Sequence, residues 1–563
     1  MIREELALYG RMAVHLRPSQ VAHRARLRTQ RAALRRWPTV GTRLLASAAA
    51  STAPGWPASF IPVDARIPQN WPSLAGLSTG RILVLGKARE LGDPPDWEQT
   101  GMPLLWRFHL HYWDWAWGLA ASSDRPAARA VFSRLWRSWQ DSCPFGRGDA
   151  WLPYPAALRA WSWCGLYRDL VAGSDIEPEF VSALLAHAAF LRSHLESDVG
   201  GNHLIKDLKA LAGLGVFLAR EQLLQRALRL LRRQLATQVL PDGGHYERAP
   251  AYHCQVLADL MDLSRLLRTA GRPPPPELSQ AVPQMRRWLG TVLCPDGTVP
   301  LLNDGYPVSD ALVTALKPGP PPTAPLLLMP DTGIVRAVAG GWHLIADVGA
   351  PCPDELPGHA HADTLGCLVY VDGQPLLVDT GTSTYAAGDV RSYERSTAAH
   401  NTAEIDGVDS TEMWGAFRVG RRARVRDQVT GIDGHGHLVA EAAHNGYQRL
   451  AGRPLHRRRW SLSTAGLRVD DKVTGREQHK VIVRWHLAPG STIRLRPGGA
   501  VVTTPAGDFP VDISASGPSR LDVEFRSVAT GFEATAIAPV LTCRMQTVLP
   551  ARVTTHWRRD VAC

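Results

Sequence analysis

The sequence predicts a multidomain protein with a helical part followed by a part built from antiparallel β-strands. Three observations support this class. The chain has 563 residues, which is too long for a single hydrophobic core. Between about residues 100 and 293, apolar residues recur every three or four positions, as in amphipathic helices. After a proline-rich stretch at 317–322, apolar and polar residues alternate instead, as in half-buried strands.

The composition is ordinary for a globular protein, with 45% hydrophobic and 20% charged residues. The eight cysteines are widely spread without a CxxC pair, which favours buried, reduced thiols. The sequence shows neither a secretory leader nor an apolar window of about twenty residues. We therefore expect a cytoplasmic protein without a membrane span; a periplasmic or secreted location applies if the assigned start misses a leader.

Residues 1–55 are predicted to form a basic, helical N-terminal segment. The net charge of the chain is +11, and arginines crowd this segment at positions 24, 26, 28, 31, 35 and 36. A solvated arginine-rich helix, a nucleic-acid contact and a membrane-surface contact all fit such a segment. A basic protein also suits an acidic polysaccharide as partner. Charge alone does not choose among them.

Residues 56–316 are predicted to form the helical domain. After short strand-like pieces at 58–95, an aromatic-rich helix is expected at 106–119, and Trp151, Tyr154 and Arg159 gather where a further helix begins. Amphipathic helices follow at about 178–197, 203–219, 221–238, 250–270 and 277–293. Their short connections predict helical hairpins packed side by side.

Two polar pieces stand out within these helices. Asn202 and His203 come at the start of one predicted helix, and the second piece runs from Glu247 to Tyr252 and His253 across a proline turn. Each has a structural interpretation, since Asn202 is a good helix cap. Taken singly, neither piece indicates catalysis.

The proline-rich residues 317–325 are predicted to be a linker, and 326–563 an antiparallel β-sandwich. Within it, two strands are expected to pair across a turn at Asp372-Gly373. If the segment around His359 and His361 is a strand, both side chains lie on one face. The hairpin could then place Asp379 beside His361.

Two imidazoles and one carboxylate, His361, Asp379 and His400, form a set suited to zinc or a similar divalent ion. The alternative is that these are solvated or hydrogen-bonded structural groups, because the chain has no short ligand motif such as HExxH.

The chain resembles the heparinase II/III-type polysaccharide lyases, a group that includes related alginate lyases. The resemblance rests on six short motifs in order between about Trp106 and Thr402. These are Asn202-His203, E-x-x-P-x-Y-H from Glu247, the turn Leu302-Asn303-Asp304-Gly305, G-H-x-H-x-D from Gly358, L-V-D-x-G from Leu377, and R-S-x-x-x-H-N-T from Arg395.

This resemblance implies an incomplete (α/α) toroid followed by an antiparallel β-sandwich, with the active site in the cleft between them. It also implies β-elimination on a uronate-containing polysaccharide or oligosaccharide, of the glycosaminoglycan or alginate type, leaving an unsaturated uronate end. Such a reaction needs neutralisation of the uronate carboxylate, a base for the C5 proton and an acid for the leaving oxygen.

By resemblance, Asn202 would contact the carboxylate, and Tyr252 would act as acid and, on one face of the sugar, also as base. His203 would be the base for the opposite C5 epimer or a partner of the carboxylate, and His359 would border the cleft. A tyrosine with a pKa of about 10 needs positive charge nearby to act as a base. The candidates for that charge are Arg159, Lys206 and Arg395.

The resemblance further implies a substrate-binding set and a metal. The substrate-binding candidates are Trp151, Tyr154, Arg159, Lys206, Glu247, Asn303 and Arg395. His361, Asp379 and His400 would hold one divalent ion, zinc first and manganese or calcium as alternatives, with a structural role. No nucleic-acid partner is expected, and a homo-oligomer is possible.

Two other functions stay open on the sequence. A glycoside hydrolase on a similar toroid needs two carboxyl groups facing each other across the bond, and Glu247 with Asp304 is the pair available. A polysaccharide-binding or exopolysaccharide assembly protein would keep the fold without turnover.

Overall fold

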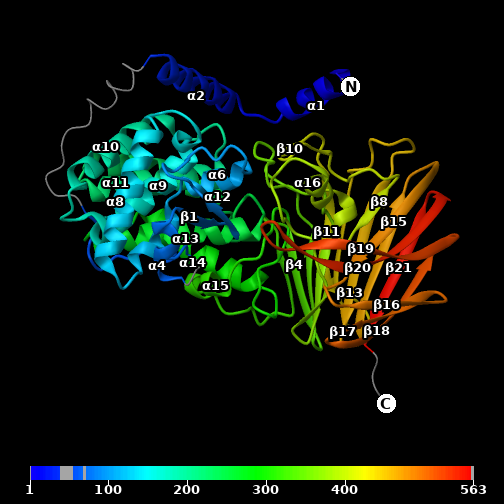
Figure 1. Ribbon diagram of the computed structural model, residues 1–563. Helices are drawn as coiled ribbons and strands as arrows, with labels where there is room; N and C mark the ends of the chain where they lie inside the picture. The colour runs from blue at the N-terminus through cyan, green and yellow to red at the C-terminus, as the bar shows by residue number, and fades with distance from the viewer. Residues whose placement is uncertain (1, 38–54, 68–70, 560–563) are drawn as a thin grey trace. The chain divides into compact units, whose positions relative to one another are not determined.

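The computed structural model describes residues 2–37, 55–67 and 71–559. The chain divides into two compact units, neither of which is continuous in sequence. The helical unit comprises Arg17–Gln238 and Gln255–Val282, and the β unit comprises Met1–Leu16, Val239–Cys254 and Pro283–Cys563. Helices dominate the chain up to α15, and strands follow (Figure 1). The predicted order of α then β is therefore confirmed.

The helical unit is built from antiparallel helical hairpins, as predicted. Helix α9 packs against α10 and α11, and α11 packs against α12. A Cβ atom at Gly215 would lie 2.7 Å from the backbone nitrogen of Leu224, so glycine permits this last close approach. The longer helices are α8 (Arg125–Ser142), α9 (Pro153–Leu166), α10 (Glu177–His194), α11 (Gly201–Phe217), α12 (Glu221–Gln238), α13 (Pro250–Thr269) and α14 (Pro276–Val292).

The first part of the chain contains α1 (Ile2–Ala13) and α2 (Pro18–Arg36), both within the predicted basic helical segment. The rest of the predicted basic segment, 38–54, lies outside the described residues. The short elements that follow are α4 (Val63–Arg66), α5 (Leu74–Ser78) and the hairpin of β1 (Arg81–Val84) and β2 (Lys87–Glu90). Among the described residues, no helix is long and apolar enough to cross a membrane.

The predicted helix at 106–119 is wrong as a single element. It is divided into α6 (Leu104–Leu110), a 3-10 turn (Asp114–Ala116) and α7 (Trp117–Ala120). Trp113 has a left-handed backbone with φ of 61°, which ends the helical path. The break allows both Trp113 and Trp115 to be buried. Apolar spacing alone could not show this, because every residue of the stretch is compatible with a helix.

The β unit contains three larger antiparallel sheets, and the predicted sandwich is confirmed. Trp342 from the five-stranded sheet, Trp460 from the eight-stranded sheet and Trp485 from the four-stranded sheet belong to one buried core. The Val371↔Gln374 pair closes the predicted hairpin at Asp372-Gly373. The short helix α15 (Asp310–Leu316) precedes the sheets, and α16 (Asp389–Glu394) lies between strands.

The strands are as follows. The five-stranded sheet has the order β3 (Leu326–Met329), β4 (Ile334–Ala339), β5 (Trp342–Asp347), β6 (Cys367–Val371) and β7 (Gln374–Leu377). The eight-stranded sheet has the order β11 (Val425–Ile432), β12 (Leu438–His444), β13 (Leu455–Ser463), β14 (Gly466–Thr474), β21 (Ala551–Arg558), β18 (Gly507–Ala515), β17 (Gly499–Thr504) and β16 (Thr492–Arg496). The four-stranded sheet has the order β19 (Ser519–Gly531), β20 (Ala534–Val548), β15 (Gln478–His486) and β8 (Ala403–Ile405), and β9 (Met413–Trp414) pairs with β10 (Arg418–Val419).

Candidate active site

Asp304 is the centre of a buried polar cluster in the β unit. It follows Asn303, whose left-handed backbone (φ of 54°) forms a tight turn. This turn directs the Asp304 carboxylate toward the interior. Asp304 Oδ1 lies 2.9 Å from His361 Nε2, and Oδ2 lies 2.9 Å from His359 Nδ1. Arg391 completes the cluster by donating from Nη2 to Oδ2 at 2.9 Å. One carboxylate therefore organises two histidines and an arginine.

The two histidines converge by a route other than the predicted one. His359 and His361 lie in irregular turns between β5 and β6, so the expected strand is wrong. The His-x-His spacing still leads both rings to one site, because each ring bonds a different oxygen of Asp304. The loop is anchored by Asn303, whose Oδ1 accepts a hydrogen bond from the His361 backbone nitrogen at 2.9 Å.

Arg391 was not among the residues predicted from the sequence. Burial would raise the pKa of Asp304, but Arg391 and the hydrogen bonds from His359 and His361 hold that pKa well below 3.8. Arg395, which was predicted, is also buried, and its guanidinium donates to backbone carbonyls of Ala360 and Gly415. Of two arginines four residues apart, only the first reaches the carboxylate. No local sequence signal distinguishes them.

His359 connects this cluster to Tyr252. Its Nε2 lies 3.1 Å from Glu247 Oε2, so each ring nitrogen faces a carboxylate oxygen. The His359 and Tyr252 rings stack with centroids 3.8 Å apart. The Tyr252 hydroxyl lies 2.7 Å from the hydroxyl of Tyr385, a second residue that sequence reasoning missed. The imidazole is thus held on three sides.

The phenol of Tyr252 is kept protonated at neutral pH. Burial raises its pKa well above 10, and Tyr385, Tyr306 and Asp304 raise it further. The sequence predicts that positive charge on Arg159, Lys206 or Arg395 lowers this pKa, but the main causes of the shift all raise it. A protonated phenol suits proton donation better than proton removal.

The helical unit holds the other predicted catalytic residues, Asn202 and His203. Asn202 lies in the first turn of α11 and is buried, while Gly200 occupies the cap position expected for Asn202. His203 is about one-third exposed, and its Nδ1 lies 3.1 Å from Glu196 Oε2. Its ring packs on Tyr154 with centroids 4.3 Å apart. Asn202, His203 and Tyr154 therefore cluster around the start of α11.

The other predicted substrate-binding residues of the helical unit are engaged inside it. Arg159 is fully buried, its Nε donates to His187, and its guanidinium lies 4.3 Å from the Trp139 ring centroid. Trp151 is buried as well and stacks on His187. Lys206 Nζ donates to Asp259 at 2.7 Å. Because all three side chains are buried, they contribute to the packing of this unit.

The three predicted metal ligands only partly suit an ion. His361 Nδ1 and His400 Nε2 are buried without hydrogen-bond partners, and the two rings lie 5.3 Å apart. Two such nitrogens are what a divalent ion would use. Asp379, however, accepts a hydrogen bond from His400 Nδ1 at 2.8 Å. Across the described residues, no group of three or more His, Cys, Asp or Glu side chains has metal-binding geometry. The ion stays a prediction.

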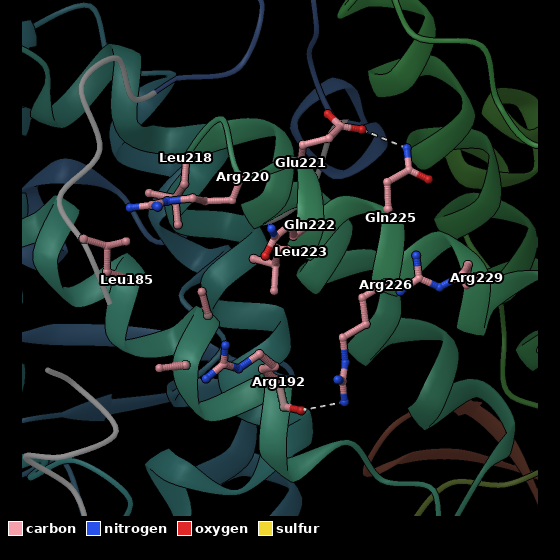
Figure 2. A pocket seen from close by; sticks show the side chains of 12 residues that line it. Leu185, Arg192, Leu218, Arg220, Glu221, Gln222, Leu223, Gln225, Arg226 and Arg229 are labelled. Atoms are coloured by element: carbon pink, nitrogen blue, oxygen red, sulfur yellow. Dashed lines mark hydrogen bonds between the residues drawn. The ribbon is translucent and has the colours of Figure 1, made fainter. Parts of the chain in front are cut away.

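A separate pocket of about 630 Å³ lies on the helical unit (Figure 2). Its walls come from α10, α12 and the turn before α12, and they combine leucine and alanine side chains with arginines. The arginines are Arg192, Arg220, Arg226 and Arg229. None of the predicted catalytic or metal-binding residues lines it. This pocket is distinct from the Asp304 cluster.

Comparison with protein families gives two adjacent matches. Residues 92–317 match the family described as heparinase II/III N-terminus, and residues 321–543 match the family described as heparinase II/III-like, C-terminal. Together the two matches run through both predicted domains, and the break between them falls in the predicted linker.

Individual relatives were found in sequence and in structure. FtsZ-localized protein C of Caulobacter vibrioides (strain NA1000 / CB15N) is 28% identical over 454 residues, covering 75% of this chain and 77% of that protein. The crystal structure of heparinase III has a TM-score of 0.76 at 16% identity, covering 95% of this chain and 91% of that one. A mutant of heparan sulfate lyase HepC from Pedobacter heparinus has a TM-score of 0.64 at 17% identity, covering 90% and 86%. At such identities the structural matches show the fold alone.

Proposed function

The chain belongs to the heparinase II/III family, and we propose that it is a polysaccharide lyase that cleaves a uronate-containing chain by β-elimination. The observation that carries this proposal is the Tyr252–His359 pair, in which a protonated phenol stacks on an imidazole held by two carboxylates. In β-elimination the C5–H and C4–O bonds break, a C4–C5 double bond forms, and the leaving oxygen takes up a proton. Water is not consumed.

Tyr252 is proposed as the donor of that proton. Its raised pKa keeps the proton on the phenol until the leaving oxygen becomes basic. His359 is proposed to contact the sugar beside it, because its side chain is the partly exposed member of the Asp304 cluster. Arg391 and Asp304 act as positioning residues, since both are buried and act through His359. The roles of Asn202 and His203 stay predictions from the sequence.

The arrangement of the carboxylates disfavours hydrolysis. A glycosidase needs two carboxyl groups that reach opposite sides of one glycosidic bond. Glu247 and Asp304 are both buried, and both face the same imidazole, that of His359. Asp304 is also bound by Arg391. Neither carboxylate is open to a sugar and a water molecule together.

The proposal is tested with a panel of alginate, heparan, chondroitin and hyaluronan. A lyase releases an unsaturated uronate that absorbs ultraviolet light, and Tyr252→Phe should abolish that absorbance. New reducing ends without absorbance would show hydrolysis instead.

A second candidate is a binding or assembly function without turnover. The observation that favours it is the name of the curated relative, FtsZ-localized protein C, which describes a location and no reaction. This candidate expects no product from any polysaccharide of the panel. It also expects the chain to sediment with FtsZ polymers. A lyase product together with no sedimentation would rule this candidate out.

A further inference from the structure

Helix α2 is attached to the helical unit along one narrow stripe. Its buried residues are Gln20, Leu27 and Leu34, which recur every seven positions and so lie on one side of the helix. Gln20 Nε2 donates to the Asp198 carbonyl, and the Leu34 side chain packs at Gly146, where a Cβ would lie 2.9 Å from it. The remaining surface of α2 faces away from these contacts.

That outward surface is basic and has almost no compensating charge. The sequence contains no aspartate or glutamate between Glu5 and Asp64. Within the described residues, the exposed side chains of Arg26, Arg28, Arg35 and Arg36 form no ion pair. Arg24 is the exception, since its Nε lies 3.4 Å from Asp198 Oδ2.

Apolar side chains lie between and beside these arginines. Val21 is 54% exposed, and Trp37, which follows the last turn, is 57% exposed. The helical period also places Ala22, Ala25 and Ala32 on the side opposite the buried stripe. A small apolar face bordered by arginines is the pattern of a helix that lies in a lipid–water interface. Arginine stems can lie along the acyl boundary while the guanidinium stays with the headgroups.

We propose that the outward surface of α2 binds the surface of an anionic lipid bilayer. Each arginine close to such a surface strengthens binding about fivefold, so four unpaired arginines are enough for a measurable, salt-sensitive attachment. Duplex nucleic acid would use the same arginines for its phosphates but would gain little from Val21, Trp37 and the alanines. The inference is independent of the proposed lyase reaction, because no residue of α2 belongs to the Asp304 cluster.

The test is sedimentation of the full chain with vesicles of phosphatidylcholine, with and without phosphatidylglycerol. We expect binding to the anionic vesicles alone, and release at high salt as the charges are screened. The variant with Arg26, Arg28, Arg35 and Arg36 all changed to Gln should bind at least about tenfold more weakly. Val21→Asn, which removes apolar surface without changing the charge, should also weaken vesicle binding, and phosphate contact alone would not require this. Circular dichroism would show that the variants keep the helix content of the parent chain.

The matched control removes four charges elsewhere on the same unit. Arg192, Arg226, Arg229 and Arg233 are exposed and form no ion pair with the described residues (Figure 2 shows the first three). Their change to Gln should leave vesicle binding within about twofold of the parent. Equal losses in both variants would mean nonspecific charge attraction and would overturn the proposal. Absence of binding to anionic vesicles would also overturn the proposal, as would tighter binding to a DNA duplex that Val21→Asn does not alter.

Discussion

The two units each contain a buried charge cluster, and the clusters differ in what they connect to. In the β unit, Asp304 binds His359, His361 and Arg391. In the helical unit, Asp259 binds Lys206 at 2.7 Å and Lys209 at 2.9 Å, and both lysines are buried. In both places a carboxylate pKa is lowered by neighbouring cations against the effect of burial.

The difference lies in the groups that each cluster contacts, because the outermost side chains, His359 and Lys206, are similarly exposed, at 13% and 10%. His359 is partly exposed and stacks on the phenol of Tyr252, so the Asp304 cluster ends at a group that can transfer a proton. In the Asp259 cluster, Lys209 contacts Asp262 and the Trp161 ring, whose centroid lies 4.1 Å from Nζ. A buried charge cluster is therefore not in itself a sign of catalysis. What marks a candidate site is contact between the cluster and a group that can transfer a proton.

The sharpest test of this comparison is Tyr252→Phe. Loss of a general acid is expected to lower kcat/KM by about 10²- to 10⁴-fold on a polysaccharide that the chain cleaves. Stability should fall by only about 1 kcal/mol, for one lost hydrogen bond. Tyr447→Phe is the matched control, because that buried hydroxyl donates to the Ala403 carbonyl at 2.7 Å in the same unit. It should cost similar stability and leave kcat/KM unchanged.

Asp304→Asn and Asp259→Asn test the two clusters directly. Each leaves buried cations without their carboxylate, so each should lower the free energy of unfolding by about 3–5 kcal/mol. Urea unfolding at neutral pH would measure this. Only Asp304→Asn should also reduce kcat/KM of the folded protein. If Asp259→Asn reduced it equally, the distinction between the clusters would be lost.

The pH dependence of stability should separate the clusters next. Burial raises the pKa of Asp262 to about 6, whereas its unfolded value is about 3.9. The folded state thus holds this proton more tightly, and that stabilisation is complete below about pH 4 and lost as the pH rises through 6. Relative to the parent, the free energy of unfolding of Asp262→Asn should rise by up to about 3 kcal/mol between pH 4 and 7.

Asp304 should show the opposite sign, because its folded pKa is lowered. Its stabilisation is present above the unfolded pKa of about 3.9 and is lost as the pH falls further. The cost of Asp304→Asn should therefore stay constant from pH 5 to 7 and shrink on acidification. Urea unfolding across pH for both variants provides the measurement, and parallel curves would contradict the assignment of the two pKa shifts.

The smallest expected effect concerns the predicted ion. Elemental analysis should find close to one divalent ion per chain, and His361→Ala should lose this ion. The control is His444→Ala, at another buried histidine of the β unit, which should keep the ion. Because a structural ion stabilises the fold without entering the reaction, chelation should lower the melting temperature and change kcat/KM by less than about threefold. A folded, active protein without any ion would remove the metal from this site.

Most of the fold could be predicted from the sequence, because helix and strand periodicities are local. The predicted helix at 221–238 coincides with α12, and the hairpin at Asp372-Gly373 forms as expected. The failures come where backbone geometry departs from the local pattern. Trp113 takes a left-handed conformation within an otherwise helical stretch, and the segment around His359 forms turns in place of the strand considered for it.

The sequence by itself determined the order of helical and β regions and the motifs that place the chain in its family. Tertiary structure decided which polar residues meet. Asp304 and Arg391 are 87 positions apart, and nothing in either neighbourhood indicates that they pair. It also separated Arg391, which binds the carboxylate, from Arg395, which binds backbone carbonyls. The physical reason is that burial selects partners by distance in space, and residue type sets only which bonds are available.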